Sequence, residues 1–91
     1  MNSDEIRKVI VSVLDTKPIL KGVSPEADFF DLGASSLTVV DLQLQVEEVL
    51  SIEVDTALLM ATPTLNGWVK IYIESTPAGA ESNDEAATAT A

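Results

Sequence analysis

Apolar residues recur at helical spacing in three segments of this 91-residue chain, and this spacing limits its fold more than any other feature. In residues 3–16 they stand at positions i, i+3, i+4, i+7 and i+8, starting from Ile6, which is the stripe of an amphipathic helix. Ser3 is expected to cap this helix, and two acids follow it in the first turn, where the helix dipole favours anions. The first segment therefore predicts a helix over residues 3–16.

The second segment begins at Ser35 or Ser36 and continues to about Leu50. The third follows Thr64, which is placed to cap a final helix. The apolar residues that repeat at helical spacing in this last helix are Leu65, Trp68, Val69, Tyr72 and Ile73. Trp68 stands on the apolar side, so we expect it in the core or at its rim and not as a platform for a ligand.

Two shorter stretches connect these segments. Residues 51–55 alternate in polarity but are too few to predict a strand, so we expect a linker with Ile52 and Val54 turned inward. Residues 56–61 can form one short helical turn before Pro63, which breaks it.

Residues 17–34 are predicted to be a long loop, because Pro18, Gly22 and Pro25 disfavour a helix there. A loop of this length in a small domain needs anchors in the core. The apolar residues that could anchor it are Ile19, Leu20, Val23, Phe29, Phe30 and Leu32. The whole pattern predicts an all-α fold, a small four-helix bundle with three main helices, a short third helix, and a long loop between helices one and two.

The amino-acid composition excludes several classes of protein. The chain has no Cys and no His, which removes disulfides, the usual zinc sites and catalytic pairs built on either residue. A formal net charge of −10 argues against nucleic acid and anionic membrane surfaces as partners and favours a basic protein partner. No signal peptide or membrane-spanning run is apparent, so we expect a cytoplasmic monomer. We divide the chain into a domain, residues 1–74, and a disordered acidic Ala/Thr-rich tail, residues 75–91.

Helix two has two apolar sides when its residues are placed at about 100° each around the axis. The core side is predicted to hold Val39, Leu42, Val46, Val49 and Leu50. A second stripe, Leu37, Val40 and Leu44, is bordered by Ser36 and Glu47 on one side and by Asp41 and Glu48 on the other. An apolar stripe fenced by acids is typical of a contact face, because Asp and Glu are seldom buried without partners. The alternative is a central helix that is buried nearly all round.

The paired serines Ser35 and Ser36 stand where helix two begins. A serine hydroxyl is a poor nucleophile without a neighbouring base, and the nearest lysine before them is Lys21, so the chain is not expected to be an enzyme. A phosphate attached there would meet free backbone N–H groups and the positive end of the helix dipole. The alternative from local chemistry is that both serines only cap the helix.

The segment DFFDLGASSL, residues 28–37, resembles the modification-site motif of the acyl and peptidyl carrier proteins: an aromatic pair, Asp-Leu-Gly, two variable positions, then Ser followed by Leu or Ile. Aligned in this way, the modified residue is Ser36 and Ser35 takes the variable place before it. EEVLSIEVD and ATPTLNGWVKIYI are also similar to the family, so that the resemblance covers residues 4–74. Many members have Asp or His before the modified Ser, and Ser35 departs from that pattern.

The resemblance implies a covalent 4'-phosphopantetheine arm on Ser36, added from coenzyme A by a phosphopantetheinyl transferase. The thiol of the arm would hold an acyl, polyketide or aminoacyl group as a thioester, so that the absence of Cys is no obstacle. Expected partners are acyltransferase, adenylating or ketosynthase-type enzymes with basic docking surfaces. The residues expected to contact partners or to flank the arm are Ser35, Leu37, Val40, Asp41, Leu44, Glu47, Glu48 and Met60.

Within that family, a discrete carrier of a polyketide or nonribosomal peptide pathway is favoured over one of fatty acid synthesis. A cofactor-free acidic helical adaptor that binds through Leu37, Val40 and Leu44 is the main alternative. A third possibility is a phosphoacceptor, with Ser36 phosphorylated by a kinase.

Overall fold

Helix α1 (Ser3–Leu14) begins at Ser3, and its cap lies one residue before the predicted one. Asn2 is the cap: its Oδ1 accepts from the Glu5 N–H at 2.9 Å, and its own N–H donates to Glu5 Oε1 at 3.1 Å. The prediction of Ser3 as cap is wrong, because this reciprocal pair satisfies two backbone donors at once. The helix ends at Leu14 instead of residue 16, because the next N–H groups, of Thr16 and Lys17, bond carbonyls only three residues back.

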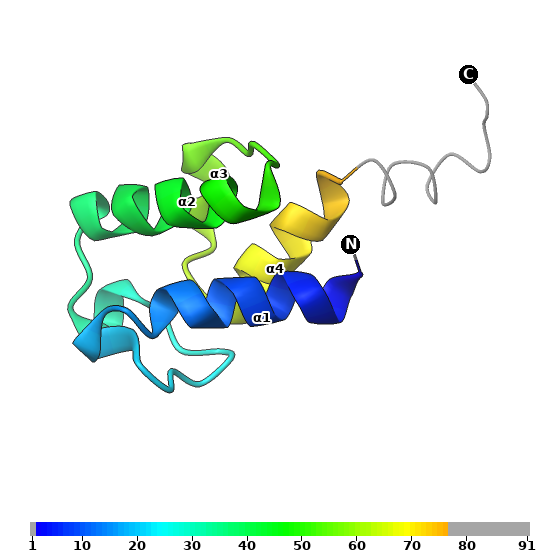
Figure 1. Cartoon of the computed structure of the whole chain (residues 1–91). Helices are drawn as coiled ribbons and strands as arrows, with labels where there is room; N and C mark the ends of the chain where they lie inside the picture. Colours follow the sequence, from blue (N-terminus) through cyan, green and yellow to red (C-terminus); the bar gives the residue numbers. More distant parts are fainter. Residues whose placement is uncertain (1, 77–91) are drawn as a thin grey trace, which may run out of the picture.

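Residues 2–76 are described by the computed structural model and contain four α-helices and no strand. The other helices are α2 (Ser36–Leu50), α3 (Thr56–Ala61) and α4 (Leu65–Glu74). Helix α1 packs against α4 and α2, while α3 packs against α2 and α4, as Figure 1 shows. The predicted all-α four-helix bundle with a short third helix is confirmed. The tail predicted for residues 75–91 lies, from residue 77 on, outside the described residues.

The long loop between α1 and α2 contains two short 3-10 turns, η1 (Pro18–Leu20) and η2 (Phe30–Leu32). Leu20 and Phe29 are fully buried, and the Phe29 N–H donates to the Pro63 carbonyl at 2.8 Å, so these residues anchor the loop. The other predicted anchors behave differently. Val23 is partly buried, whereas Ile19, Phe30 and Leu32 are 46%, 37% and 40% exposed. The prediction that these three anchor the loop is wrong, because η1 buries only Leu20 and η2 buries none of its residues.

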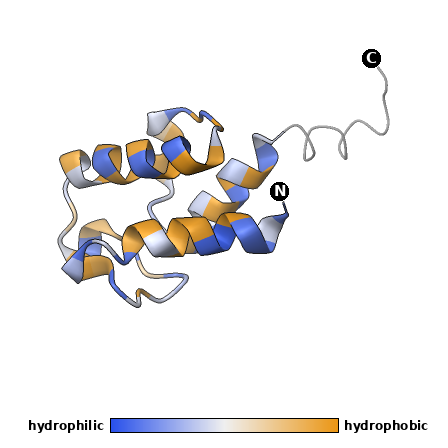
Figure 2. Ribbon diagram, viewed as in Figure 1, coloured by the Kyte–Doolittle hydropathy of each residue, from blue (hydrophilic) through white to orange (hydrophobic). Residues whose placement is uncertain are grey.

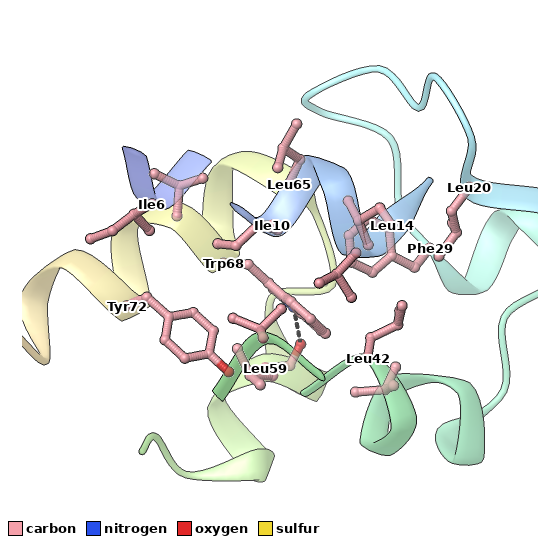
Figure 3. Packing of buried hydrophobic residues seen from close by; sticks show 14 of the residues in the cluster. Ile6, Ile10, Leu14, Leu20, Phe29, Leu42, Leu59, Leu65, Trp68 and Tyr72 are labelled. Atoms are coloured by element: carbon pink, nitrogen blue, oxygen red, sulfur yellow. Dashed lines mark hydrogen bonds between the residues drawn. The ribbon is translucent and has the colours of Figure 1, made fainter. Parts of the chain in front are cut away.

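Trp68 of α4 lies at the centre of the core. Its side chain is fully buried, and its indole N–H donates to the Leu59 carbonyl at 3.1 Å (Figure 3). Phe29 meets it edge to face, with ring centroids 5.3 Å apart, a favourable geometry for two aromatic rings. Trp68 is thus core, as predicted, and it connects the loop, α3 and α4.

Helix α4 starts as the sequence predicts. Thr64 caps it, with Oγ1 accepting from the Gly67 N–H at 3.0 Å. Gly67 is a weak helix former, but a Cβ at this position would collide with the methyl group of Thr62. The glycine therefore allows α4 to start directly against the end of α3. No helix among residues 2–76 has the length and apolar character needed to cross a bilayer.

The buried side of α2 differs from the predicted one at two positions. Val39, Leu42, Val46 and Leu50 are buried as expected. Val49 is 58% exposed, so its assignment to the core is wrong. Gln43 is buried in its place, because all of its side-chain polar atoms find hydrogen-bond partners there, which removes the usual cost of burying an amide.

The connector between α2 and α3 has no regular structure, as predicted, and Ile52 and Val54 are partly buried against the core. Ser51 ends α2 with φ of 56°, the left-handed conformation that favours glycine. We expect Ser51→Gly to stabilise the protein by about 1 kcal/mol, because glycine adopts this conformation without steric cost.

Urea denaturation followed by circular dichroism measures this effect. Ser12→Gly is the matched control, since Ser12 is exposed in the interior of α1. It should lower the free energy of unfolding by about 0.5 kcal/mol. Destabilisation by both substitutions would contradict the strain assigned to Ser51.

Candidate functional site

Residues 28–34 form the segment that leads into α2. The Asp28 carboxylate accepts from the N–H groups of Phe30 and Asp31 at 2.8 and 3.3 Å, which fixes the start of η2. Gly33 then reverses the chain with φ of 106°, a conformation that suits glycine. The Ala34 N–H returns to the Phe29 carbonyl at 3.0 Å. Two further residues bring the chain to the first turn of α2.

The two serines have different tasks at this helix start. Ser35 is the cap: its Oγ accepts from the Thr38 N–H at 3.2 Å, and its own N–H donates to Thr38 Oγ1 at 3.3 Å. Ser36 is the first helical residue and is exposed, and its hydroxyl has no hydrogen-bond partner among residues 2–76. Of the two exposed serines, only Ser36 has a hydroxyl that is free of hydrogen bonds to residues 2–76.

The predicted stripe on the outer side of α2, which we name the α2 strip, consists of Leu37, Val40 and Leu44. Leu37 is 81% exposed, Val40 37% and Leu44 64%. The alternative of a helix buried nearly all round is therefore wrong. Figure 2 shows hydrophobic residues along the visible side of α2 as well as in the loop near its start. Exposed apolar side chains at this spacing suit contact with a partner.

Asp41, on one border of the α2 strip, forms an ion pair with Lys17. The Gln45 amide also donates to this carboxylate, at 3.3 Å. The hydrogen bond from Lys17 is the main reason why the pKa of Asp41 is lowered, and the positive charge of Lys17 adds to it. Asp41 therefore remains ionised, and the ion pair is lost only as the pH falls through this lowered pKa. Glu48, on the same border, is exposed.

Glu47 does not border the α2 strip in the way that the sequence predicts. Its Oε2 accepts from the Gln43 amide at 3.0 Å, from the Val54 N–H at 3.1 Å and from the Tyr72 hydroxyl at 3.2 Å. The carboxylate thus joins α2 to the connector and to α4. Burial, followed by the nearby charge of Glu47, raises the pKa of Tyr72, so its hydroxyl stays protonated and keeps donating.

Gln43 completes this polar cluster at the junction of α2 and α3. Its amide N–H also donates to the Val54 carbonyl at 3.0 Å, and its carbonyl accepts from the Thr56 hydroxyl at 2.6 Å. Periodicity assigned no role to Gln43, since a polar residue on the buried side is indistinguishable from a mismatch in the pattern. The cluster fixes the position of α3 relative to α2.

Helix α3 contributes differently to the surface than expected. Met60, predicted to flank the modified serine's arm, is partly buried against the core, and its neighbour Leu59 is fully buried. Leu58 is the exposed apolar residue of this helix, at 52%. The sequence analysis missed Leu58 because six residues are too few for a periodic pattern to define a face.

Acidic residues dominate the middle of the chain, from the loop before α2 to the start of α4. No Lys or Arg occurs between Lys21 and Lys70, whereas this stretch contains eight of the acids. Among residues 2–76, the one ion pair is that of Lys17 with Asp41, so most of these acids lack a counter-charge. No group of three acids within the same residues converges in a way that could hold a metal ion.

A family model described as "Phosphopantetheine attachment site" matches residues 4–71, which include α1, α2, α3 and most of α4. No solved structure gives a significant match to the chain.

Proposed function

Since this chain belongs to the phosphopantetheine-attachment family of carrier proteins, which carry a group but do not catalyse, we propose that its arm is attached to Ser36. We propose further that the arm carries an acyl, polyketide or aminoacyl intermediate between the enzymes of a specialised biosynthetic pathway. Covalent 4'-phosphopantetheine supplies the thiol on which such a group is held as a thioester.

We choose Ser36 as the attachment point because the two serine hydroxyls differ in their hydrogen bonds. Ser35 Oγ is held by Thr38, and its use as an attachment point would remove the cap of α2. Ser36 Oγ is exposed and unbonded among the described residues, and modification there leaves the cap intact. The same difference supports Ser36 over Ser35 without any reference to a motif.

The start of α2 also fits the phosphate of the arm. The first N–H groups of a helix have no partner within the helix. Ser35 satisfies the N–H of Thr38, and Val39 donates to the Ser35 carbonyl at 3.1 Å, which leaves the N–H groups of Ser36 and Leu37 for an anion. The positive end of the helix dipole adds a favourable field.

Residues 2–76 place no base in hydrogen-bond contact with the Ser36 hydroxyl. The proton of this hydroxyl must therefore be removed by a group of the phosphopantetheinyl transferase, which a carrier of this family requires. What this chain contributes is an exposed hydroxyl, a rigid helix start and a surface on which the transferase can dock.

We propose the α2 strip, with Asp41 and Glu48 beside it, as the surface that partners contact. The exposure of Leu37, Val40 and Leu44 supports this assignment, and so does the absence of Lys and Arg from residues 22–69. Glu47 is better explained as a structural residue, since its carboxylate already accepts three hydrogen bonds. Leu58 is a further exposed apolar residue, on the neighbouring helix α3.

Leu37→Asn should lower kcat/KM for phosphopantetheine transfer about tenfold, the loss expected when a central interface residue is removed. The matched control is Val49→Asn, which changes an equally apolar, exposed residue on another side of α2. Transfer to the control should stay within a factor of two of wild type, by our estimate for a residue outside the interface. Equal losses in both variants would exclude the α2 strip as the docking surface.

Incubation of the full chain with coenzyme A and a promiscuous phosphopantetheinyl transferase tests the proposed function. We expect intact-mass spectrometry to show the addition of a single phosphopantetheinyl group. A cofactor-free adaptor would gain no mass with any transferase. A phosphoacceptor would gain only phosphate, and only with a kinase and ATP.

A further inference from the structure

Three exposed apolar side chains in the loop before α2 have no role in the function described so far. Ile19 belongs to η1, and Phe30 and Leu32 belong to η2. We name these three residues the loop patch. They are large and apolar, and each is more than one third exposed.

The loop patch lies close to Ser36. Ile19 Cδ1 is 3.9 Å from the position of a Cβ on Gly33, so η1 lies against the residue three places before Ser36. Leu32 precedes Ser36 by four residues, and both turns lie at the same end of the bundle as the start of α2 in Figure 1. The hydrogen bonds of Asp28 and the Ala34 N–H hold η2 in a fixed shape. The patch is therefore preorganised next to the attachment point.

The geometry of α2 directs a group on Ser36 toward this loop. Side chains of an α-helix tilt toward its N-terminus, so a substituent on the first helical residue leaves α2 in the direction of the preceding segment. The α2 strip extends the opposite way, toward the C-terminus of the helix. A group that followed the strip would have to turn back along the helix.

The charges beside the two surfaces are similar. The phosphodiester of the arm is anionic, and the α2 strip is bordered by Asp41 and Glu48, with Lys17 to balance one of them. The two turns of the loop patch have two acids beside them, Asp31 and Asp28, whose carboxylate accepts from the Phe30 N–H, and one exposed base, Lys21. Charge therefore does not distinguish the two surfaces, and the choice of the loop patch depends on the direction in which the Ser36 side chain leaves α2.

We propose that, in the absence of a partner, the pantetheine arm on Ser36 rests on the loop patch. This inference depends on the proposed function. The aliphatic part of the arm, above all its geminal dimethyl group, would contact Phe30, Leu32 and Ile19. The α2 strip then stays free for a partner, which can dock before it takes up the arm.

Nuclear magnetic resonance of the isotope-labelled full chain with an unlabelled arm tests the proposal. Isotope-filtered spectra of the holo form should show nuclear Overhauser effects from the geminal methyl protons to the Phe30 ring and the Leu32 methyl groups. Shift changes from apo to holo form should be larger at the loop patch than at Val40 and Leu44. Intact mass of the same sample confirms that the arm is attached.

Phe30→Ser is the test variant, since its ring is exposed and not part of the core, and Val49→Ser is the matched control. The variant should accept the arm but lose most of the contacts with Leu32, while the control keeps them. A fully modified wild-type chain with contacts only to the α2 strip, or with none, would overturn this inference and leave the proposed function intact. A chain that never gains the arm would overturn both.

Discussion

Ser36→Ala should abolish phosphopantetheine transfer, and Ser35→Ala should preserve it. The first change removes the exposed hydroxyl at the start of α2, and no other described group takes its place. The second removes a helix cap, so we expect it to lower the free energy of unfolding by about 1 kcal/mol. Intact mass after incubation with coenzyme A and transferase measures the transfer, and urea denaturation measures the stability.

The pair of variants makes the result independent of folding. Ser36→Ala keeps the Ser35–Thr38 capping box, so its circular dichroism spectrum should equal that of wild type while its mass stays unchanged. Ser35→Ala should show the opposite combination, full modification and reduced stability. Full modification of Ser36→Ala would assign the arm to a different residue.

Trp68→Ala should destabilise the protein by about 3–5 kcal/mol, the cost of removing a large buried aromatic side chain. Trp68 has no exposed surface, packs edge to face on Phe29, and donates its indole N–H to the Leu59 carbonyl. A domain of this size has little stability to lose, because it buries a smaller share of its surface than larger domains do. We therefore expect the variant to be largely unfolded at 25 °C.

Trp68→Phe is the matched control. It keeps an aromatic ring in the core and loses only the indole N–H and part of the volume, so the loss should be smaller, about 1–2 kcal/mol. Circular dichroism in urea is the suitable measurement, since both changes remove the single Trp of the chain and its fluorescence. Equal stabilities of the Ala variant and wild type would contradict a core centred on Trp68.

The helices and the α2 strip could be predicted from the sequence because both depend on local spacing. The positions of Leu37, Val40 and Leu44 around the helix axis follow from 3.6 residues per turn, and their exposure follows from the acids beside them. Capping by Thr64 and the turn at Gly33 depend on backbone chemistry within a few residues. Such features require no knowledge of what packs against them.

The polar cluster could not be predicted, because it joins residues far apart in the chain. In the sequence Glu47 cannot be told from a surface acid, because only the fold brings Tyr72 and the Val54 N–H to its carboxylate. Gln43 interrupts the apolar pattern in the sequence, and only the fold brings Thr56 and Val54 close enough to form hydrogen bonds with its amide. The burial of Gln43 and the partial burial of Glu47 depend on partners that only the fold supplies.

The loop shows a similar limit. All of its apolar residues were equal candidates for anchoring, since a loop has no repeating geometry from which to choose among them. Phe29 became the anchor because Trp68 and the Pro63 carbonyl are both within its reach. Phe30, its neighbour, was left exposed as a result.

The most direct test of the central claim is site-localised mass spectrometry of the full chain purified from cells that express its own pathway. We predict a phosphopantetheinyl group on the peptide that contains Ser36, with an additional mass that hydroxylamine releases, as expected for a thioester. Material that always has the mass of the bare polypeptide, even after exposure to an active transferase and coenzyme A, would contradict the account.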